Sequence, residues 1–298
     1  MAVVELVWGE RSMLDVDGVG IHVETAGERN GPTIACLHGF GSGTFGWAGV
    51  APSWAAAHRV VAWDRPPFGR SDRPEPPSDR GGGRALRPDP YGSQAVLAQA
   101  RAVLASGGCG RPLVLVGHSA GTVVATELVR AGGVAVDGVV LIAPALQARP
   151  PAAVTRLFDL PGAPTVGAAA LRLGLRGARQ ALRRLGQHPT PLIEATGSET
   201  ARCLQRPGTA EALVHLTRTF TPPPPLGELG PLGVSTVVVS GADDRISRPP
   251  ATRAVAEGLD ARLEVLDDVG HAPQEQVPDV VAALVADFVE SLGSGAPR

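Results

Sequence analysis

The chain has 298 residues, of which 44% are hydrophobic and 19% are charged, and its formal net charge is −2 at pH 7. This length suits one large α/β domain or two small domains, and it can bury a sizeable core. The near-neutral charge gives no electrostatic basis for nucleic-acid binding, which usually requires a strong basic excess.

Short β-branched runs alternate with longer Ala- and Leu-rich runs, which is typical of a mostly parallel sheet flanked by helices. Several short runs are continuously apolar, as expected for strands that are covered on both faces. The predicted strands are Ile21–Thr25, Thr33–Leu37, Arg59–Trp63, Pro112–Gly117, Asp137–Ile142, Ser235–Ser240 and Arg262–Leu266. The predicted helices that pack between them are Ser93–Ala105, Ala120–Arg130 and Val277–Leu292.

Two segments interrupt this alternation. Asp72–Pro90 contains five prolines and a run of three glycines, which predict a long surface loop. Ala145–Thr221 contains no convincing strand, and its leucines from Leu171 to Leu185 recur at helical spacing. We therefore expect a helical insertion over one end of the sheet. The expected domains are a core formed by residues 1–144 and 222–298 and a cap formed by residues 145–221.

One pattern near the N-terminus fits a dinucleotide-binding turn. Gly41–Gly46 matches G-x-G-x-x-G, and the strand Arg59–Trp63 ends at Asp64, about where such a fold places the acid that binds the ribose. However, His38-Gly39-Phe40 occupies the turn between the strand and the first glycine, and a better-specified motif lies downstream. We therefore expect neither a nicotinamide nor a flavin cofactor.

The better-specified motif is Gly117-His118-Ser119-Ala120-Gly121, placed between an apolar strand and a helix. G-x-S-x-G in this position predicts a nucleophile elbow, a turn so tight that the serine backbone is strained. The two glycines keep side chains out of the crowded turn, and the serine hydroxyl projects at the carboxyl end of the strand. The Ala120 N–H and the dipole of the helix point to where an oxyanion would form.

Serine is a poor nucleophile at neutral pH and needs an adjacent base, and histidine titrates closest to that pH. His271 follows the predicted strand Arg262–Leu266, so we expect it at the carboxyl end of the sheet, where Ser119 lies. We predict that His271 is the base. The competing histidines are His22, His38, His58, His118, His188 and His215.

Most of these competitors are less well placed. His118 adjoins the nucleophile but should project away from its hydroxyl on the far side of the elbow. We expect His22 and His58 at the wrong end of the sheet, because they lie on an early strand or near a strand start. His188 and His215 fall in the insertion, where they could touch substrate or lie on solvated helix faces.

An acid must orient the imidazole and stabilise its charged form. Asp243 and Asp244 both follow the predicted strand Ser235–Ser240, again at the carboxyl end. Asp267 and Asp268 lie so close to His271 in the sequence that the required geometry is awkward. The residues alone therefore leave both Asp243 and Asp244 as candidates.

The order of these motifs resembles the α/β-hydrolase superfamily in its capped, single-domain branch, and the resemblance covers nearly the whole chain. His38-Gly39-Phe40 resembles the family's HG motif, which implies that the Phe40 N–H is the second oxyanion donor. Gly241–Asp244 resembles the acid turn, whose G-x-x-D spacing selects Asp244, and Gly270–Pro273 resembles the histidine turn. The resemblance thus implies the order Ser119, Asp244, His271.

Two positions depart from the family pattern. Asp64–Ser71 resembles the loop D-x-P-G-x-G-x-S, but Pro67 stands where glycine is usual. Thr122 follows G-x-S-x-G, where the family usually has another glycine.

The type of nucleophile narrows the reaction. Family members that open epoxides or displace halide use aspartate at the elbow, so Ser119 argues against both activities. An oxygen nucleophile with an oxyanion hole favours acyl chemistry on an ester, thioester or lactone, with no metal or organic cofactor. Carbon–carbon bond hydrolases, cofactor-free perhydrolases and acyltransferases share the same three residues. A ligand receptor that retains them is an alternative of another class.

All 27 basic residues are arginine, and ten of them lie between Arg149 and Arg218, against four acidic residues. One hypothesis is that the cap attracts an anionic substrate or an acidic acyl-carrier partner. A solvated polar face on an amphipathic helix explains the same pattern, and we favour it. The expected partner is therefore a small-molecule acyl substrate.

Three cysteines, Cys36, Cys109 and Cys203, have no metal-ligand spacing and cannot form a complete set of disulfides. They fit a reducing compartment. The N-terminus lacks the features of a signal peptide, and nowhere do 18 uninterrupted apolar residues occur. These observations predict a cytoplasmic protein without a membrane span.

Overall fold

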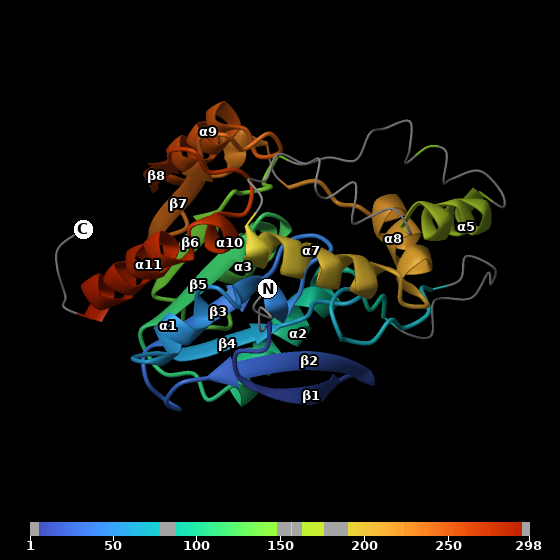
Figure 1. The fold of residues 1–298 in the computed structure, drawn as a ribbon, viewed down its shortest axis with the longest axis horizontal. Coiled ribbons are helices and arrows are strands. Elements are labelled where there is room, and N and C mark those ends of the chain that lie inside the picture. The colour runs from blue at the N-terminus through green and yellow to red at the C-terminus, as the bar shows by residue number, and fades with distance from the viewer. Residues whose placement is uncertain are drawn as a thin grey trace.

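The computed structural model describes residues 6–77, 88–147, 156, 163–175, 190–223 and 225–293. Its centre is a sheet of eight strands in the order β1-β2-β4-β3-β5-β6-β7-β8 (Figure 1). The pairs from β4 to β8 are parallel, whereas β2 pairs antiparallel with both β1 and β4. The strands are β1 (Glu10–Val16), β2 (Val19–Ala26), β3 (Thr33–Leu37), β4 (Arg59–Trp63), β5 (Leu113–His118), β6 (Gly138–Ile142), β7 (Ser235–Gly241) and β8 (Arg262–Leu266).

The mostly parallel sheet confirms the predicted fold class, and all seven predicted strands are present. The prediction missed β1, whose residues are mostly exposed and therefore lack an apolar signal. β1 is joined to β2 by a hairpin turn in which Asp17 and Gly18 both have positive φ, 55° and 80°. Asp-Gly is a sequence that favours such a turn, and it was the available sign of this strand pair.

Helices cover both faces of the sheet (Figure 1). Alternate strand residues pack on opposite faces: Ala35 and Leu37 of β3 belong to one buried cluster, and Ile34 and Cys36 belong to the other. Burial on both faces explains why the central strands are continuously apolar. The first cluster includes residues of α2 (Ser93–Ser106), α3 (Ala120–Ala131) and α9 (Pro249–Leu259). The second includes residues of η1 (Thr44–Trp47), α1 (Ala51–Ala55) and α11 (Pro278–Gly293).

Within the described residues of the insertion, the regular secondary structure is helical. Its helices are α5 (Ala163–Leu175), α7 (Pro191–Leu204) and α8 (Thr209–Arg218). α7 packs on the core through Ala201 and Leu204, which belong to one buried cluster with Phe68, and α5 packs on α8. In Figure 1, α7 runs from beside α10 (Pro273–Gln276) toward α8 and α5.

Parts of two predicted segments lie outside the described residues. These parts are residues 78–87 of the predicted loop and residues 176–185 of the predicted amphipathic helix, including Arg176, Arg179 and Arg183. Within the described ranges, no helix is both long enough and apolar enough to span a membrane.

Candidate active site

The turn between β5 and α3 holds Ser119 in an unusual conformation. Its φ and ψ are 50° and −118°, in the positive-φ region that residues other than glycine rarely adopt. The turn is closely packed: a Cβ atom on Gly117 would lie 2.9 Å from the carbonyl carbon of Gly121, and one on Gly121 would lie 2.0 Å from the Leu37 oxygen. The two glycines of the motif are therefore required by close backbone approach, and the strained turn places the Ser119 side chain beyond the end of β5.

His271 lies in the connection between β8 and α10, and its ring joins Ser119 to Asp244. Its Nε2 is 3.0 Å from Ser119 Oγ, and its Nδ1 is 2.9 Å from Asp244 Oδ2. With the Nδ1 proton donated to the carboxylate, Nε2 is free to accept the hydroxyl proton of the serine. The ring is buried, with 7% of the residue exposed.

Asp244 follows β7 and is buried, and both of its carboxylate oxygens are bonded. Oδ1 accepts hydrogen bonds from the Ile246 N–H at 2.8 Å and the Ser247 N–H at 2.9 Å, while Oδ2 faces His271. These main-chain donors fix the orientation of the carboxylate. Of the two acids that the sequence left open, Asp244 is the one whose carboxylate is hydrogen-bonded to His271.

The two predicted oxyanion donors lie at the start of α3 and in the loop after β3. Ala120 is the first residue of α3, so its N–H has no acceptor within the helix. Phe40 follows β3 in the next loop, and 63% of this residue is exposed. Its ring packs edge-on against Phe68, with ring centroids 5.1 Å apart.

His38 fixes the loop that carries Phe40. Its Nδ1 donates to the Gly39 carbonyl at 2.7 Å, and its Nε2 accepts from the Arg65 N–H at 2.9 Å. Burial lowers the pKa of His38 to about 4, so the ring is neutral near pH 7 and can accept at Nε2. These two hydrogen bonds of His38 join the loop that carries Phe40 to the turn after β4.

Asp64 is enclosed by its own turn. Its oxygens accept from the Thr44 N–H at 2.6 Å and the Arg70 N–H at 2.7 Å, and His22 Nδ1 lies 2.9 Å from Oδ2. Although burial opposes its ionisation, the charge and hydrogen bonds of its neighbours lower the pKa of the Asp64 carboxyl. Because this carboxylate is fully buried and occupied, it is not placed to bind a ribose.

The position of His22 differs from the expectation. β2 runs antiparallel to β4, so His22 lies at the carboxyl end of β4, not at the wrong end of the sheet. Its ring is still unsuited to activate Ser119, because it is buried against Asp64.

The other histidines are engaged elsewhere. His58 precedes β4, at the amino end as expected, and its Nδ1 lies 3.2 Å from the Trp54 carbonyl. His215, on α8, pairs with Asp89 at 2.9 Å. His118 points to the His271 main chain, with Nε2 2.8 Å from its carbonyl oxygen. His188 lies outside the described residues.

Two residues that the sequence reasoning did not assign also contribute to the site. Thr122 Oγ1 donates to the Ser119 carbonyl at 2.6 Å and accepts from the Ala145 N–H at 3.2 Å, so it links the elbow to the start of the insertion. Its departure from the family's glycine was the available signal. Glu275, four residues after His271, accepts from Thr196 Oγ1 of α7 at 2.6 Å, and burial raises its pKa to about 7. No sequence pattern marked that contact.

Three described arginines of the insertion have partners within the protein. Arg172 pairs with Glu211, Arg202 pairs with Glu199, and Arg206 donates to the Gly69 carbonyl at 2.9 Å. These contacts consume hydrogen-bonding capacity that an anionic substrate would need.

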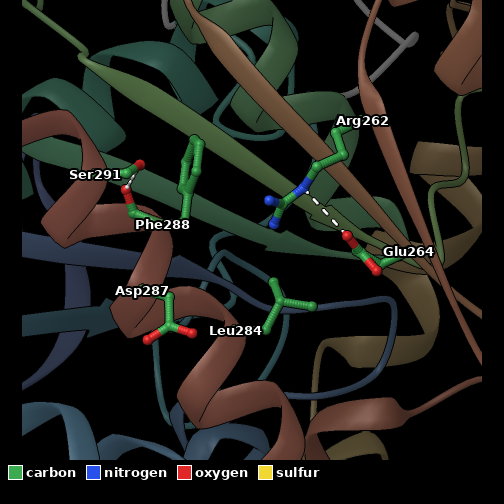
Figure 2. Close-up of a pocket in the computed structure, with 6 residues that line it drawn as sticks. All are labelled: Arg262, Glu264, Leu284, Asp287, Phe288 and Ser291. Atoms are coloured by element: carbon green, nitrogen blue, oxygen red, sulfur yellow. Dashed lines mark hydrogen bonds and ion pairs between the residues drawn. The ribbon is translucent and has the colours of Figure 1, made fainter. Parts of the chain in front are cut away.

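A surface groove of about 360 Å³ lies away from this site, between β8 and α11 (Figure 2). Arg262 is the first residue of β8, whereas His271 follows the carboxyl end of the same strand. In Figure 2 the side chains of Arg262 and Glu264 point toward each other, and Arg262 Nε lies 3.2 Å from Glu264 Oε1. The groove contains neither a histidine nor the strained serine. Its lining residues are Arg262, Glu264, Leu284, Asp287, Phe288 and Ser291.

Comparisons with known proteins agree with the fold. A family model described as "Alpha/beta hydrolase family" matches residues 34–284. The chain is 38% identical over 63 residues to the AB hydrolase superfamily protein YfhM of Bacillus subtilis (strain 168), which is 21% of this chain and 22% of that protein. The match therefore spans less than a quarter of this curated relative.

Solved structures resemble nearly the whole chain. A thermophilic esterase from Thermogutta terrifontis has a TM-score of 0.73 at 19% identity, over 95% of this chain and 99% of that chain. The epoxide hydrolase CorEH has a TM-score of 0.70, also at 19% identity, over 95% of this chain and 99% of that chain. At this level of identity the similarity shows the fold alone.

Proposed function

The chain belongs to the alpha/beta hydrolase family, and on this premise we propose that it is a serine hydrolase acting on an ester, thioester or lactone. One observation carries the proposal: a single hydrogen-bonded line runs from Ser119 Oγ through the two ring nitrogens of His271 to Asp244 Oδ2. This arrangement supplies a nucleophile, a base and an orienting acid within bonding distance.

The proposed reaction has two stages. His271 Nε2 takes the hydroxyl proton as Ser119 Oγ attacks the substrate carbonyl carbon, and the N–H groups of Ala120 and Phe40 stabilise the oxyanion. His271 then gives its proton to the leaving group, which leaves an acyl group on Ser119. Water, deprotonated by His271, attacks this acyl-enzyme, and His271 returns the proton to Ser119 Oγ as the bond to the acyl group breaks and the acid is released. Asp244 stabilises the imidazolium in both stages.

The nucleophile also distinguishes this proposal from epoxide opening. The structural similarity to an epoxide hydrolase concerns the fold. Family members with that activity use aspartate at the elbow, whereas this chain has Ser119. A serine alkoxide with an oxyanion hole is suited to a carbonyl carbon, where negative charge develops on oxygen.

The insertion, residues 145–221, is proposed as a cap over a core of residues 1–144 and 222–298. Two contacts of α7 support this division. A Cβ atom on Gly41 would lie 3.6 Å from side-chain atoms of Thr200 and Leu204, so α7 lies against the loop that carries Phe40. Thr196 of the same helix bonds Glu275, in the segment that follows His271. α7 is thus placed to shape the space in which an acyl group would bind.

Steady-state hydrolysis of p-nitrophenyl esters with acyl chains of increasing length tests the proposed function. We expect multiple turnover by the native protein and loss of at least about a thousandfold in kcat in Ser119→Ala, because the nucleophile is removed. The matched control is Ser42→Ala, a nearby serine outside the hydrogen-bonded line. Ligand binding with negligible turnover by the native protein would instead support a receptor.

A further inference from the structure

His118 precedes the nucleophile in the chain, and its side chain reaches the segment that carries the base. It is the last residue of β5 and is buried, with 8% exposed. Its Nε2 lies 2.8 Å from the main-chain carbonyl oxygen of His271, 153 positions later in the sequence. A carbonyl can only accept, so the hydrogen is on His118 Nε2 and Nδ1 is unprotonated.

This donor is neutral. Burial, reinforced by the charge of His271, lowers the pKa of His118 to about 3. The two rings lie close, with centroids 5.2 Å apart. A second positive charge at that distance would oppose protonation of His271, which the proposed reaction requires. A neutral imidazole provides the hydrogen bond without that repulsion.

The ring of His118 is also closely packed against the loop after β3 that carries Phe40. A Cβ atom on Gly39 would lie 2.9 Å from His118 Nδ1 and 3.2 Å from Ser119 Cβ. A side chain at position 39 would therefore clash with the His118 ring, and glycine avoids this clash. His118 touches the loop of one proposed oxyanion donor, follows the strand of the nucleophile and binds the segment of the base.

The hydrogen bond from His118 differs from the other hydrogen bonds next to His271. On one side, the Gly270 N–H donates to Gln276 Oε1 at 2.9 Å; on the other, the Ala272 carbonyl accepts from the Glu275 N–H at 2.9 Å. Both bonds stay within residues 270–276. The bond from His118 joins this segment to β5, so it bears on the distance between His271 Nε2 and Ser119 Oγ.

We propose that His118 is a positioning residue for the reaction: its Nε2–H fixes the His271 main chain and thereby holds the base at bonding distance from the nucleophile. This inference rests on the proposed function. It assigns to the residue between Gly117 and Ser119 a role in catalysis that involves no contact with substrate.

Two substitutions distinguish the loss of the hydrogen bond from the loss of the imidazole ring itself. In His118→Gln the amide nitrogen lies as many bonds from the main chain as Nε2 does, so it can still donate to the His271 carbonyl. In His118→Asn the amide is one bond shorter and falls short of it. We expect kcat for p-nitrophenyl esters to fall about 10- to 100-fold in His118→Asn with KM unchanged, and to stay within a few fold of native in His118→Gln.

Thermal unfolding of both variants provides the control for folding. If His118→Asn does not fold, His118→Met, which fills a similar volume without a strong donor, replaces it in the comparison. Equal kcat in the Gln and Asn variants of a folded protein would overturn the inference.

A pH profile distinguishes positioning from proton transfer by His118 itself. If His271 is the base, the rising limb of kcat/KM against pH keeps its midpoint in His118→Gln, which has no titratable group at position 118. Loss of that limb in His118→Gln would contradict the inference. Failure of the proposed function is recognised separately, because then the native protein does not turn over esters or Ser119→Ala is as active as native.

Discussion

At the scale of single residues, Ser119 combines local strain with access to its partners. A residue held at such positive φ costs on the order of 1–3 kcal/mol, and the surrounding packing must hold it there. Gly117 and Gly121 allow the close backbone approach, and Thr122 Oγ1 binds the serine carbonyl. The strain is thus sustained by neighbours on both sides of the turn, and its result is a hydroxyl within 3.0 Å of an imidazole.

Asp244 allows a sharp test of how the acid acts. In Asp244→Asn the side chain retains one carbonyl oxygen but can donate to Nδ1 and thereby stabilise the wrong tautomer of His271. We expect kcat to fall by on the order of 10³- to 10⁴-fold, measured with p-nitrophenyl esters. Asp243→Asn, one position earlier, is the matched control and should remain near native. A larger loss in Asp243→Asn than in Asp244→Asn would reverse the assignment of the acid.

The same residues show what the sequence could predict. Ser119 and His271 were predictable, because a motif and the alternation of strands placed both at the carboxyl ends of parallel strands. Asp244 needed the G-x-x-D spacing of the resemblance, since Asp243 follows the same strand. The contact of His118 with His271 was not predictable, because which way a side chain turns at the elbow depends on the packing of segments 153 residues apart.

At the scale of elements, a buried hydrogen bond joins α7 to α10. Thr196 Oγ1 of α7 donates to Glu275 Oε2 of α10 at 2.6 Å. Within the described residues, α10 packs against α7, α11 and η1, and burial is the main cause of the raised pKa of Glu275. The other titratable residues of these elements are Glu194, Glu199, Arg202, Cys203, Asp279, Asp287 and Glu290.

This junction predicts a pH-dependent stability. The pKa of Glu275 rises from 4.5 to about 7 on folding, so the folded state binds more protons between these values and stability falls as the pH rises through them. Over this range the free energy of unfolding falls by about 3 kcal/mol. In Glu275→Gln this pH dependence is absent. As the pH rises from 4.5 to 7, we therefore expect the free energy of unfolding of the variant to increase by about that much relative to native.

Urea unfolding of native protein and Glu275→Gln across that pH range measures the difference. Thr196→Val, which removes the donor, provides the comparison: it should destabilise the protein most at the upper end of the range, where the carboxylate is charged. A difference between native and Glu275→Gln that does not change with pH would contradict the prediction.

Elements also differ in how well the sequence predicted them. β3, β4 and β8 have the predicted bounds, and the buried central strands were recognisable from continuous apolar runs. β1 was not, because it lies at the edge of the sheet and exposes most of its residues. β2 runs antiparallel to β4, against the direction of the parallel strands, so the expected position of His22 was wrong.

At the scale of the whole molecule, the order of the strands brings remote segments together. β5 and β7 both pair with β6, and β8 follows at the edge, all in parallel. The connections that leave their carboxyl ends therefore meet along one side of the sheet, where Ser119, Asp244 and His271 lie. The core positions these three residues, whereas the described helices of the insertion contribute contacts around them, through Thr196 and Thr200 of α7.

The central claim is that Ser119 is a nucleophile activated by His271. Covalent labelling with a fluorophosphonate, followed by mass spectrometry of the digested protein, tests it most directly. The account predicts one adduct, on the peptide that contains Ser119, which is absent in Ser119→Ala and in His271→Ala. Retention of labelling in both variants, or an adduct on another serine of the native protein, would contradict it.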